Sequence, residues 1–291
     1  MPDLPDLANR DYVNRVNRAI DHITRHLAEP LKLDEVAKIA AFSPFHFHRI
    51  FRAVVGETLL DFVKRTRLER ALYLMSHDKR SLTEVALEVG FSSSSDFSRV
   101  FKAQFGVPPR AFDLEQWRKA HRERLFPRVP EPSATDDFPV HIRELPARRV
   151  AYLRVFDPYQ PDKVRNACLQ LVEWAKARGL EKGQWLGYMW EEPELVPLEK
   201  CRYDVGLVVP EGVALSDEVG EQRLPAMKVA EIEIKGSLEL ESKVIEWVYS
   251  VWLPRSGYVP DHQPSFEVWQ GLPFAHGEQY FELFMHLAVT K

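Results

Sequence analysis

The sequence has few of the features that would place it in several large protein classes. Only two of its 291 residues are cysteine, too few for a disulfide framework or a cysteine-based zinc site. No apolar run approaches the roughly 18 residues of a membrane-spanning helix, and the opening stretch "MPDLPDLANRD" lacks the basic and apolar regions of a signal peptide. A glycine-rich phosphate loop, a nucleophile elbow and an HExxH helix are also absent. We therefore expect a cytoplasmic protein with no membrane partner, no cofactor, no metal site and no catalytic motif.

Charge is distributed unevenly along the chain, although the net charge is only −4. Residues 1–126 contain 21 Lys and Arg against 17 Asp and Glu, a net of +4, together with six histidines. Residues 127–291 contain 18 basic against 26 acidic side chains, a net of −8. The length allows two domains, and the opposite signs suggest that the two halves have different partners.

The first half contains one pattern twice. "LDEVAKIAAFSPFHFHRIFRAVVG" (33–56) matches "LTEVALEVGFSSSSDFSRVFKAQFG" (82–106) at a separation of 49 before the serine run and 50 after it. Each copy predicts a helix, a tight turn and a second helix, because a short apolar face ends at a small residue. A serine then follows as the predicted N-cap of the second helix. The predicted turn residues and N-caps are Ala41 with Ser43 and Gly90 with Ser92.

The second helix of each copy has an aromatic inner face and a polar outer face. Its phenylalanines recur at i, i+4 spacing and are predicted to be buried. The predicted outer faces carry Phe45, His48, Arg49 and Arg52 in the first copy, and Ser94, Ser95, Ser98, Arg99 and Lys102 in the second. Small hydrogen-bonding side chains and arginines near a helix N-terminus suit a helix that enters the major groove of DNA. The alternative is a capped helix hairpin within a helical bundle, but two copies with outward arginines favour DNA binding.

Residues 10–120 resemble the DNA-binding domain of the AraC/XylS family of bacterial transcription regulators. "EVALEVGFSSSSDFSRVFKAQFGVPPRAF" (84–112) carries that family's GF, its F-x-R-x-F-K core and its closing PPxxF. The resemblance implies double-stranded promoter DNA and RNA polymerase as partners. It gives the base-reading positions to Phe45, His48, Arg49, Ser94, Ser95, Ser98 and Arg99. The serines at 94 and 95 depart from the longer amides that relatives commonly have there.

A proline-rich stretch separates the two halves. "FPRVPEPSATDD" (126–137) has three prolines, small polar residues and no apolar periodicity, so residues 121–137 are predicted to be a linker. Such a linker offers no rigid element that could transmit a distortion. We therefore expect a bound effector to change DNA binding through the placement of the domains rather than by refolding the DNA-reading helices.

The second half is also duplicated. "LPARRVAYLRV" (145–155) and "LPAMKVAEIEI" (224–234) share leucine, proline, alanine, valine and alanine, and both predict a strand after a turn. A helical segment follows each of them, and two further strands close each copy. The predicted fold is therefore an all-α tandem helix-turn-helix domain at 10–120 followed by an α+β domain of two β-α-β-β repeats at 138–291.

Several motifs of the second half resemble the GyrI-like effector-binding domain. They are "RYDVGLVV" (202–209), the duplicated LPA strands, "WLPRSGY" (252–258) and the glutamate of "SFEVW" (265–269). The resemblance implies a ligand pocket with aromatic walls and with Glu267 as its glutamate. A desolvated carboxylate among aromatic rings favours a lipophilic cation, with cation–π support of roughly 0.5–2 kcal/mol per ring. The candidate effector-binding residues are Glu267, Tyr152, Trp185, Tyr188, Trp190, Trp252, Tyr258 and Trp269.

The sequence thus predicts a sequence-specific DNA-binding regulator of transcription that responds to a small hydrophobic, cationic effector and is not an enzyme. Two alternatives stay open for the second half. Its aromatic residues could form the core of the domain, with Glu267 facing water. The domain could also hydrolyse or sequester its ligand, because some relatives use pocket carboxylates for acid–base chemistry.

Overall fold

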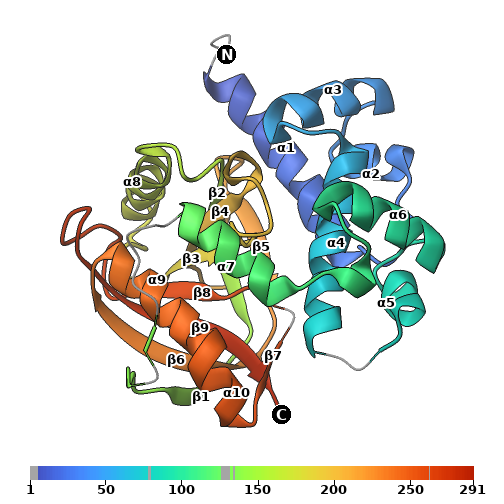
Figure 1. The fold of residues 1–291 in the computed structure, drawn as a ribbon. Coiled ribbons are helices and arrows are strands. Elements are labelled where there is room, and N and C mark those ends of the chain that lie inside the picture. The colour runs from blue at the N-terminus through green and yellow to red at the C-terminus, as the bar shows by residue number, and fades with distance from the viewer. Residues whose placement is uncertain (1–5, 78–79, 126–131, 134, 262) are drawn as a thin grey trace. The chain divides into compact units, whose positions relative to one another are not determined.

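Figure 1 shows the computed structural model, which describes residues 6–77, 80–125, 132–133, 135–261 and 263–291. The chain divides into two compact units, Met1–His121 and Arg122–Lys291. Within the predicted linker 121–137, the first five residues belong to a helix, whereas residues 126–131 and 134 lie outside the described residues. No described helix combines the length and the apolar composition needed to cross a membrane.

The described residues of the first unit form helices and no strands, and the predicted all-α fold is confirmed. The second and third helices, and likewise the fifth and sixth, form the two helix-turn-helix units. The helices are α1 (Asp6–Arg25), α2 (Leu33–Ile39), α3 (Pro44–Val55), α4 (Leu59–His77), α5 (Leu82–Glu88), α6 (Ser94–Phe105), a 3-10 turn (Pro109–Ala111) and α7 (Leu114–Leu125). In Figure 1, α4 connects the two helix-turn-helix units.

The turn residues agree with the predictions, but one N-cap does not. Ala41 and Gly90 both adopt positive φ, 52° and 91°, the left-handed conformation that a tight turn between helices requires. Ser43 caps α3, as predicted, by accepting from the amide of His46. The prediction of Ser92 as the cap of α6 is wrong, because Ser93 occupies that position. The extra serine of the second copy therefore lies before its N-cap. The two caps, Ser43 and Ser93, are separated by 50 residues, as are the helices that follow them.

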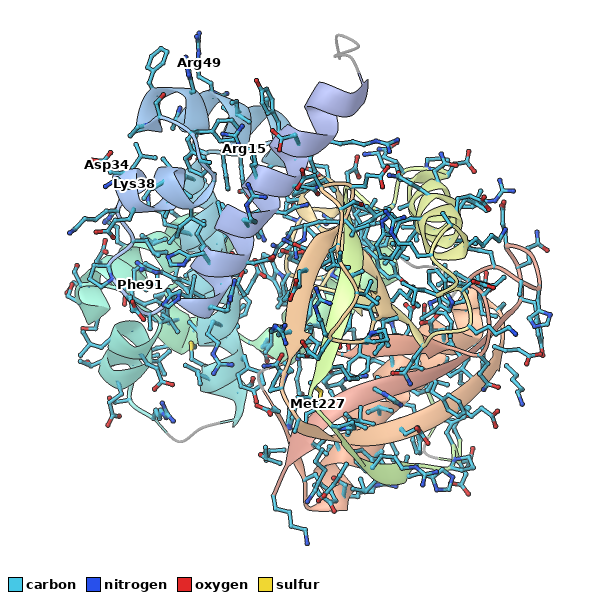
Figure 2. The ribbon with its side chains drawn as sticks, turned by 180° about the vertical axis from the view of Figure 1, so that it is seen from behind. Arg15, Asp34, Lys38, Arg49, Phe91 and Met227 are labelled. Carbon is cyan, nitrogen blue, oxygen red and sulfur yellow. The ribbon has the colours of Figure 1, made fainter. Side chains whose placement is uncertain are left out.

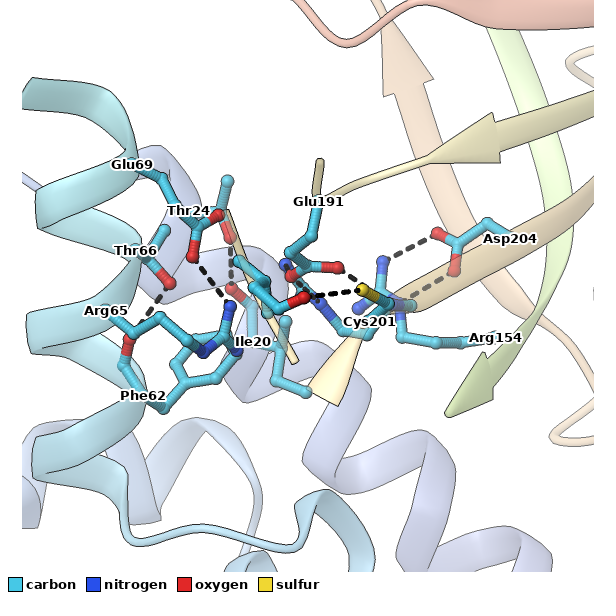
Figure 3. Close-up of polar contacts among 12 residues, drawn as sticks. Ile20, Thr24, Phe62, Arg65, Thr66, Glu69, Arg154, Glu191, Cys201 and Asp204 are labelled. Atoms are coloured by element: carbon cyan, nitrogen blue, oxygen red, sulfur yellow. Dashed lines mark hydrogen bonds and ion pairs between the residues drawn. The ribbon is translucent and has the colours of Figure 1, made fainter. Parts of the chain in front are cut away.

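Aromatic side chains form the core of the first unit. Phe47 and Phe51 of α3, and Phe97 and Phe101 of α6, are completely buried, as their i, i+4 spacing predicts. The same core contains a buried charge on α4, where Arg65 donates to Glu57 at 2.7 Å and to Glu69 at 2.8 Å. Figure 3 shows the contact with Glu69. Two carboxylates accept from this guanidinium, so its positive charge is not left unpaired on burial.

The second unit is built on an antiparallel sheet. Its strands are β1 (His141–Leu145), β2 (Arg148–Phe156), β3 (Trp185–Met189), β4 (Arg202–Val208), β5 (Gly220–Leu224), β6 (Met227–Gly236), β7 (Val259–Pro260), β8 (Phe266–Trp269) and β9 (Phe281–Thr290). The strand order is β1-β6-β9-β8-β3-β4-β2-β5, and β7 pairs with β9. The helices are α8 (Lys163–Lys176), α9 (Leu238–Trp247), a π-helical turn (Val248–Trp252) and α10 (Leu253–Ser256), with a 3-10 turn at Leu198–Lys200.

The two predicted β-α-β-β repeats are present as β2-α8-β3-β4 and β6-α9-β8-β9. The structure adds one strand before each of them. β1 pairs with β6 of the other repeat, and β5 pairs with β2, so each repeat contributes its leading strand to its partner. The duplicated Leu-Pro-Ala motif marks the short connection between the leading strand and the first strand of the repeat proper. The two halves of the sheet join where β3 pairs with β8.

The sheet buries both of its faces. α8 packs on one face over β2 and β4, and α9 packs on the same face over β6, which creates two apolar clusters. The opposite face packs against itself: Val150 of β2, Val229 of β6 and Phe266 of β8 belong to one buried cluster. Successive strand residues therefore enter different environments, one beneath the helices and one inside the curled sheet.

Candidate functional site

The outer faces of α3 and α6 form the candidate DNA-binding surface of the first unit. All four predicted residues of α3 are exposed, and the ring of Phe45 is 67% exposed. Arg49 projects outward from α3 (Figure 2), with its guanidinium carbon 5.5 Å from the centre of the Phe45 ring. His48, Arg49 and Arg52 line a shallow hollow on the surface of this helix. The helix thus presents two cations, an imidazole and an aromatic ring on one side.

The equivalent face of α6 is more polar. Ser95, Arg99 and Lys102 are exposed, whereas Ser94 and Ser98 are half-buried. The side chain of Arg99 is 73% exposed, and its Nη2 contacts Asp96 Oδ1 at 2.6 Å. Because an exposed ion pair of this kind contributes little stability, we interpret the contact as one that positions Arg99 on the outer face. All nine predicted DNA-contacting side chains therefore reach the surface at least in part.

The second candidate site surrounds Glu267 on β8. This glutamate is only 8% exposed and lies on the face of the sheet that the helices cover, where its Oε2 accepts a hydrogen bond of 2.6 Å from the hydroxyl of Tyr203 on β4. The strand between them is β3, whose Gly187 pairs directly with Glu267. A Cβ atom at this glycine would overlap the Tyr203 hydroxyl and lie 2.6 Å from Glu267 Oε2. Only glycine at 187 therefore lets the tyrosine reach the glutamate across β3.

A second buried carboxyl group completes this site. Glu241 of α9 is 5% exposed, lies within hydrogen-bonding reach of Glu267, and has one carboxyl oxygen with no partner among the described residues. Burial, followed by the neighbouring negative charge, raises the pKa of Glu241 well above its ordinary value. Burial also raises the pKa of Glu267, although hydrogen bonds from Tyr203 and Glu241 oppose this shift. A hydrogen bond between two carboxyl groups needs a proton, and we therefore interpret the pair as sharing one.

Sequence reasoning did not identify Glu241, Tyr203 or Gly187. Glu241 could have been found, because it lies at i, i+3 and i+6 spacing with Val244 and Trp247 on the buried side of α9. A charged residue within such an apolar stripe is a signal for a buried polar site. Tyr203 belongs to the RYDVGLVV motif (202–209). Its hydrogen bond to Glu267 depends on the strand order β8-β3-β4, which the motif does not contain.

The eight predicted effector-binding residues do not meet at one site. Trp269 and Trp185 lie on the same face as Glu267, but Trp185 is fully buried and its indole donates to the carbonyl of Glu181 at 3.1 Å. Trp269 is half-buried against Phe274, with ring centres 5.2 Å apart. Both tryptophans therefore share the helix-covered face of the sheet with Glu267, and Trp269 is a direct neighbour of its carboxyl group.

Tyr152 and Tyr188 lie on the opposite face, inside the curled sheet, because their positions alternate with those of the site residues. Trp190 is in contact with two arginines, Arg154 and Arg202, at 5.3 and 5.6 Å. On this side of the sheet Arg154 also forms a bidentate pair with Asp204 (Figure 3). The structure thus separates these three aromatic residues from Glu267.

Trp252 and Tyr258 stack on each other, with ring centres 6.3 Å apart, and pack at the edge of the apolar cluster beneath α9. Trp252 ends the π-helical turn, an irregular element that is frequent at functional sites. Among the described residues, no group of three or more His, Cys, Asp or Glu side chains is placed to hold a metal ion.

Comparison with known proteins gives the affiliation of each unit. A family model described as a helix-turn-helix domain matches residues 36–114, and one described as a GyrI-like small molecule binding domain matches residues 138–285. The HTH-type transcriptional regulator YbfP of Bacillus subtilis is 32% identical over 101 residues, which cover 35% of this chain and 34% of YbfP. The chain thus spans about a third of the length of that relative.

The regulatory protein SoxS of Escherichia coli K12 is 36% identical over 87 residues, which cover 30% of this chain and 81% of SoxS. Among solved structures, the C-terminal domain of EcmrR matches 53% of this chain and 98% of its own length, with 13% identity and a TM-score of 0.38. The chain belongs to the AraC-type helix-turn-helix family through its first unit and to the GyrI-like small molecule binding domain family through its second.

Proposed function

We propose that the chain is a one-component regulator of transcription: the first unit binds promoter DNA and the second binds a small lipophilic cation without converting it. The buried carboxyl pair of Glu241 and Glu267 carries the ligand part of the proposal, because neither group forms an ion pair with a basic side chain among the described residues. A buried negative charge without a counter-charge favours a ligand that brings a positive one. Family membership and the duplicated basic helices support the DNA part.

In the proposed DNA complex, α3 and α6 enter successive major grooves on one side of the duplex. Arg49 and Arg99 are then the most informative residues, since an arginine that reads a base contributes roughly 1–3 kcal/mol. Replacing either with alanine is expected to weaken specific binding by that amount and non-specific binding by less. An exposed arginine of the second unit, Arg165, supplies the control substitution. A footprint with the purified monomer that protects only one groove segment would reject tandem binding.

For the ligand, the carboxyl pair supplies the charge and the neighbouring tryptophans supply apolar area. Tetraphenylphosphonium is a suitable probe, because it is a lipophilic cation with no hydrogen-bond donors. Its binding to the full chain can be followed by tryptophan quenching. Glu267→Gln is expected to weaken this binding at least tenfold, whereas Glu278→Gln, at an exposed position, leaves it unchanged. Equal affinities for the wild type and Glu267→Gln would remove the charge-based argument. Retained binding by several unrelated cations would extend the proposal to multidrug recognition.

Hydrolysis is the second candidate function, and one observation favours it: Glu241 and Glu267 are two buried carboxyl groups side by side whose pKa values are both raised, an arrangement suited to acid–base chemistry. The two functions differ in their response to Glu267→Gln. A hydrolase loses turnover with little loss of binding, whereas a cation receptor chiefly loses binding. Mass spectrometry of candidate ligands after incubation with the protein distinguishes these outcomes.

The proposal also includes RNA polymerase as the protein partner of the promoter complex and the cytoplasm as the location of both interactions. Family membership supports this assignment. Transcription from a target promoter in a purified system, with and without the probe cation, would show whether the polymerase responds and in which direction.

A further inference from the structure

A second polar cluster lies on the face of the sheet opposite Glu267, inside the curled sheet. Its central residue is Arg148, the first residue of β2, which is only 9% exposed. The Arg148 guanidinium contacts Gln184 Oε1 at 3.4 Å and Met227 Sδ at 4.0 Å. Its Cζ lies 5.0 Å from the centre of the Phe266 ring. Its Nε–H has no hydrogen-bond partner among the described residues.

Arg148 differs from the other buried arginines of the described chain. Arg65, Arg154 and Arg202 each contact a buried carboxylate at 2.6 to 2.7 Å. Arg148 has no such ion pair with any described residue, although a guanidinium stays charged at every physiological pH. Burying a charge without a counter-charge costs several kcal/mol. The sheet therefore holds one buried positive charge that its own described residues leave uncompensated.

Two further polar atoms without partners surround the same ring. Tyr188 stacks on Phe266 with ring centres 4.8 Å apart, and His286 meets its edge at 4.9 Å. Neither the Tyr188 hydroxyl nor His286 Nδ1 has a hydrogen-bond partner among the described residues. Burial lowers the pKa of Arg148 and raises that of Tyr188, and the proximity of the two side chains opposes both shifts. Three side chains that contact the Phe266 ring thus each carry one buried polar atom with no partner among the described residues.

We propose that Arg148 and Tyr188 bind one small monovalent anion, either a short carboxylate or a halide. Water could satisfy their hydrogen bonds, but only an anion also neutralises the guanidinium. Because His286 Nε2 faces the carboxylate of Glu231 at 3.1 Å, the neutral imidazole carries its proton there and presents Nδ1 as an acceptor. The anion therefore takes its hydrogen bonds from Arg148 and Tyr188, and we propose a small one because all three side chains around Phe266 are buried.

The anion site is separate from the proposed cation site. Glu267 lies on the face of the sheet beneath the helices. Arg148 lies on the other face, inside the curled sheet, with the side chains that alternate with those of the first face. The two sites have opposite charges and do not compete for one ligand. If no cation binds at Glu267, the proposed anion site is unaffected, and if no anion binds at Arg148, the proposed cation site is unaffected.

The test compares the thermal unfolding midpoint of the full chain in sodium formate, sodium acetate and sodium bromide, with sodium sulfate at equal ionic strength as reference. A ligand that binds only the folded state raises the folding constant up to tenfold for each tenfold increase of ligand above its dissociation constant. The wild type is expected to show this increase with at least one monovalent anion. Arg148→Met is expected to lose it and to unfold no earlier than the wild type in sulfate. Arg165→Met, a control at an exposed arginine, keeps it.

Several outcomes overturn the proposal. A wild type with the same midpoint in all four salts has no anion site. An Arg148→Met chain that unfolds earlier but keeps the anion response shows that the arginine is purely structural. If Arg148→Met does not fold, Tyr188→Phe keeps the ring stack and removes one donor, so it must still weaken the anion response. Crystals grown in bromide distinguish the two anion sources: an anomalous peak beside Arg148 supports a halide site, and a response to formate without such a peak supports a carboxylate site.

Discussion

The buried carboxyl pair makes the stability of the second unit depend on pH in a defined direction. Burial holds the pKa of Glu241 above its ordinary value of 4.5 in the folded protein, and unfolding restores that value. Between the two values the folded state binds a proton that the unfolded state lacks. The associated stability is therefore fully present below pH 4.5 and is lost as the pH rises toward the folded-state pKa.

Glu241→Gln isolates this effect. The amide has nearly the size of the protonated carboxyl group and can still donate to Glu267, but it cannot ionise. One proton corresponds to about 1.4 kcal/mol per pH unit. We therefore expect the unfolding free energy of the wild type to fall relative to Glu241→Gln by up to that amount per unit, starting near pH 5. The variant becomes the more stable protein at the alkaline end of the series.

Urea denaturation at pH 5, 6, 7 and 8 measures this difference. Tryptophan fluorescence reports mainly on the second unit, since Trp117 is the only one of seven tryptophans before residue 170. Glu278→Gln, at an exposed position, serves as the control and should give a constant difference from the wild type. If the difference between the wild type and Glu241→Gln is also constant over the four pH values, the two carboxyl groups do not share a proton and the argument fails.

Four further predictions follow from particular contacts. The same shared proton should make the binding of a monovalent cation stronger as the pH rises, by up to tenfold per unit, and Glu241→Gln should remove most of this dependence in a quenching titration. Ser93→Ala should destabilise the first unit by about 1 kcal/mol through loss of the α6 cap, whereas Ser92→Ala should cost little; equal effects in urea denaturation would contradict the cap assignment. Gly187→Ala should displace the tyrosine from the carboxyl pair and weaken cation binding, while Gly212→Ala, which meets nothing within 4 Å, should not. Finally, if ligand and DNA binding are coupled, specific DNA should change cation affinity by the factor by which the cation changes DNA affinity, typically about 1–3 kcal/mol; identical cation affinities with and without DNA, at two salt concentrations, would show uncoupled units.

Local patterns were sufficient to predict the first unit, because its structure follows from short-range chemistry. Small residues at the turns and phenylalanines at i, i+4 spacing are all defined within a few residues. The exception, the cap at Ser93, arose within the serine run. Any of several serines can accept a hydrogen bond from a helix N-terminus, so composition alone could not select the cap.

The second unit was predictable in its repeats but not in its site. Alternation along a strand decides which residues share a face, but it does not say which strands are neighbours. Tyr188 and Glu267 are both strand residues that were expected in one pocket, yet Tyr188 is paired with Phe266 and therefore lies on the other face of the sheet from Glu267. The two leading strands exchanged between repeats were also missed, because pairing between distant segments leaves no local signature.

The register between the repeats explains why one acid stands at this point of the sheet. β3 and β8 are equivalent strands, and Gly187 pairs directly with Glu267, so these two positions are counterparts in the two repeats. The same ladders make Tyr203 the counterpart of Leu283, since Gly187 pairs with Val205 and Glu267 pairs with Met285.

Two glutamates at these positions would bring like charges together at the junction, and two glycines would leave it without a charge. The glycine of one repeat makes room for a tyrosine that hydrogen-bonds the glutamate of the other. The candidate ligand site thus lies where the two copies have diverged from each other. For this reason the residues that we propose to bind the ligand do not follow the repeat pattern that reveals the fold.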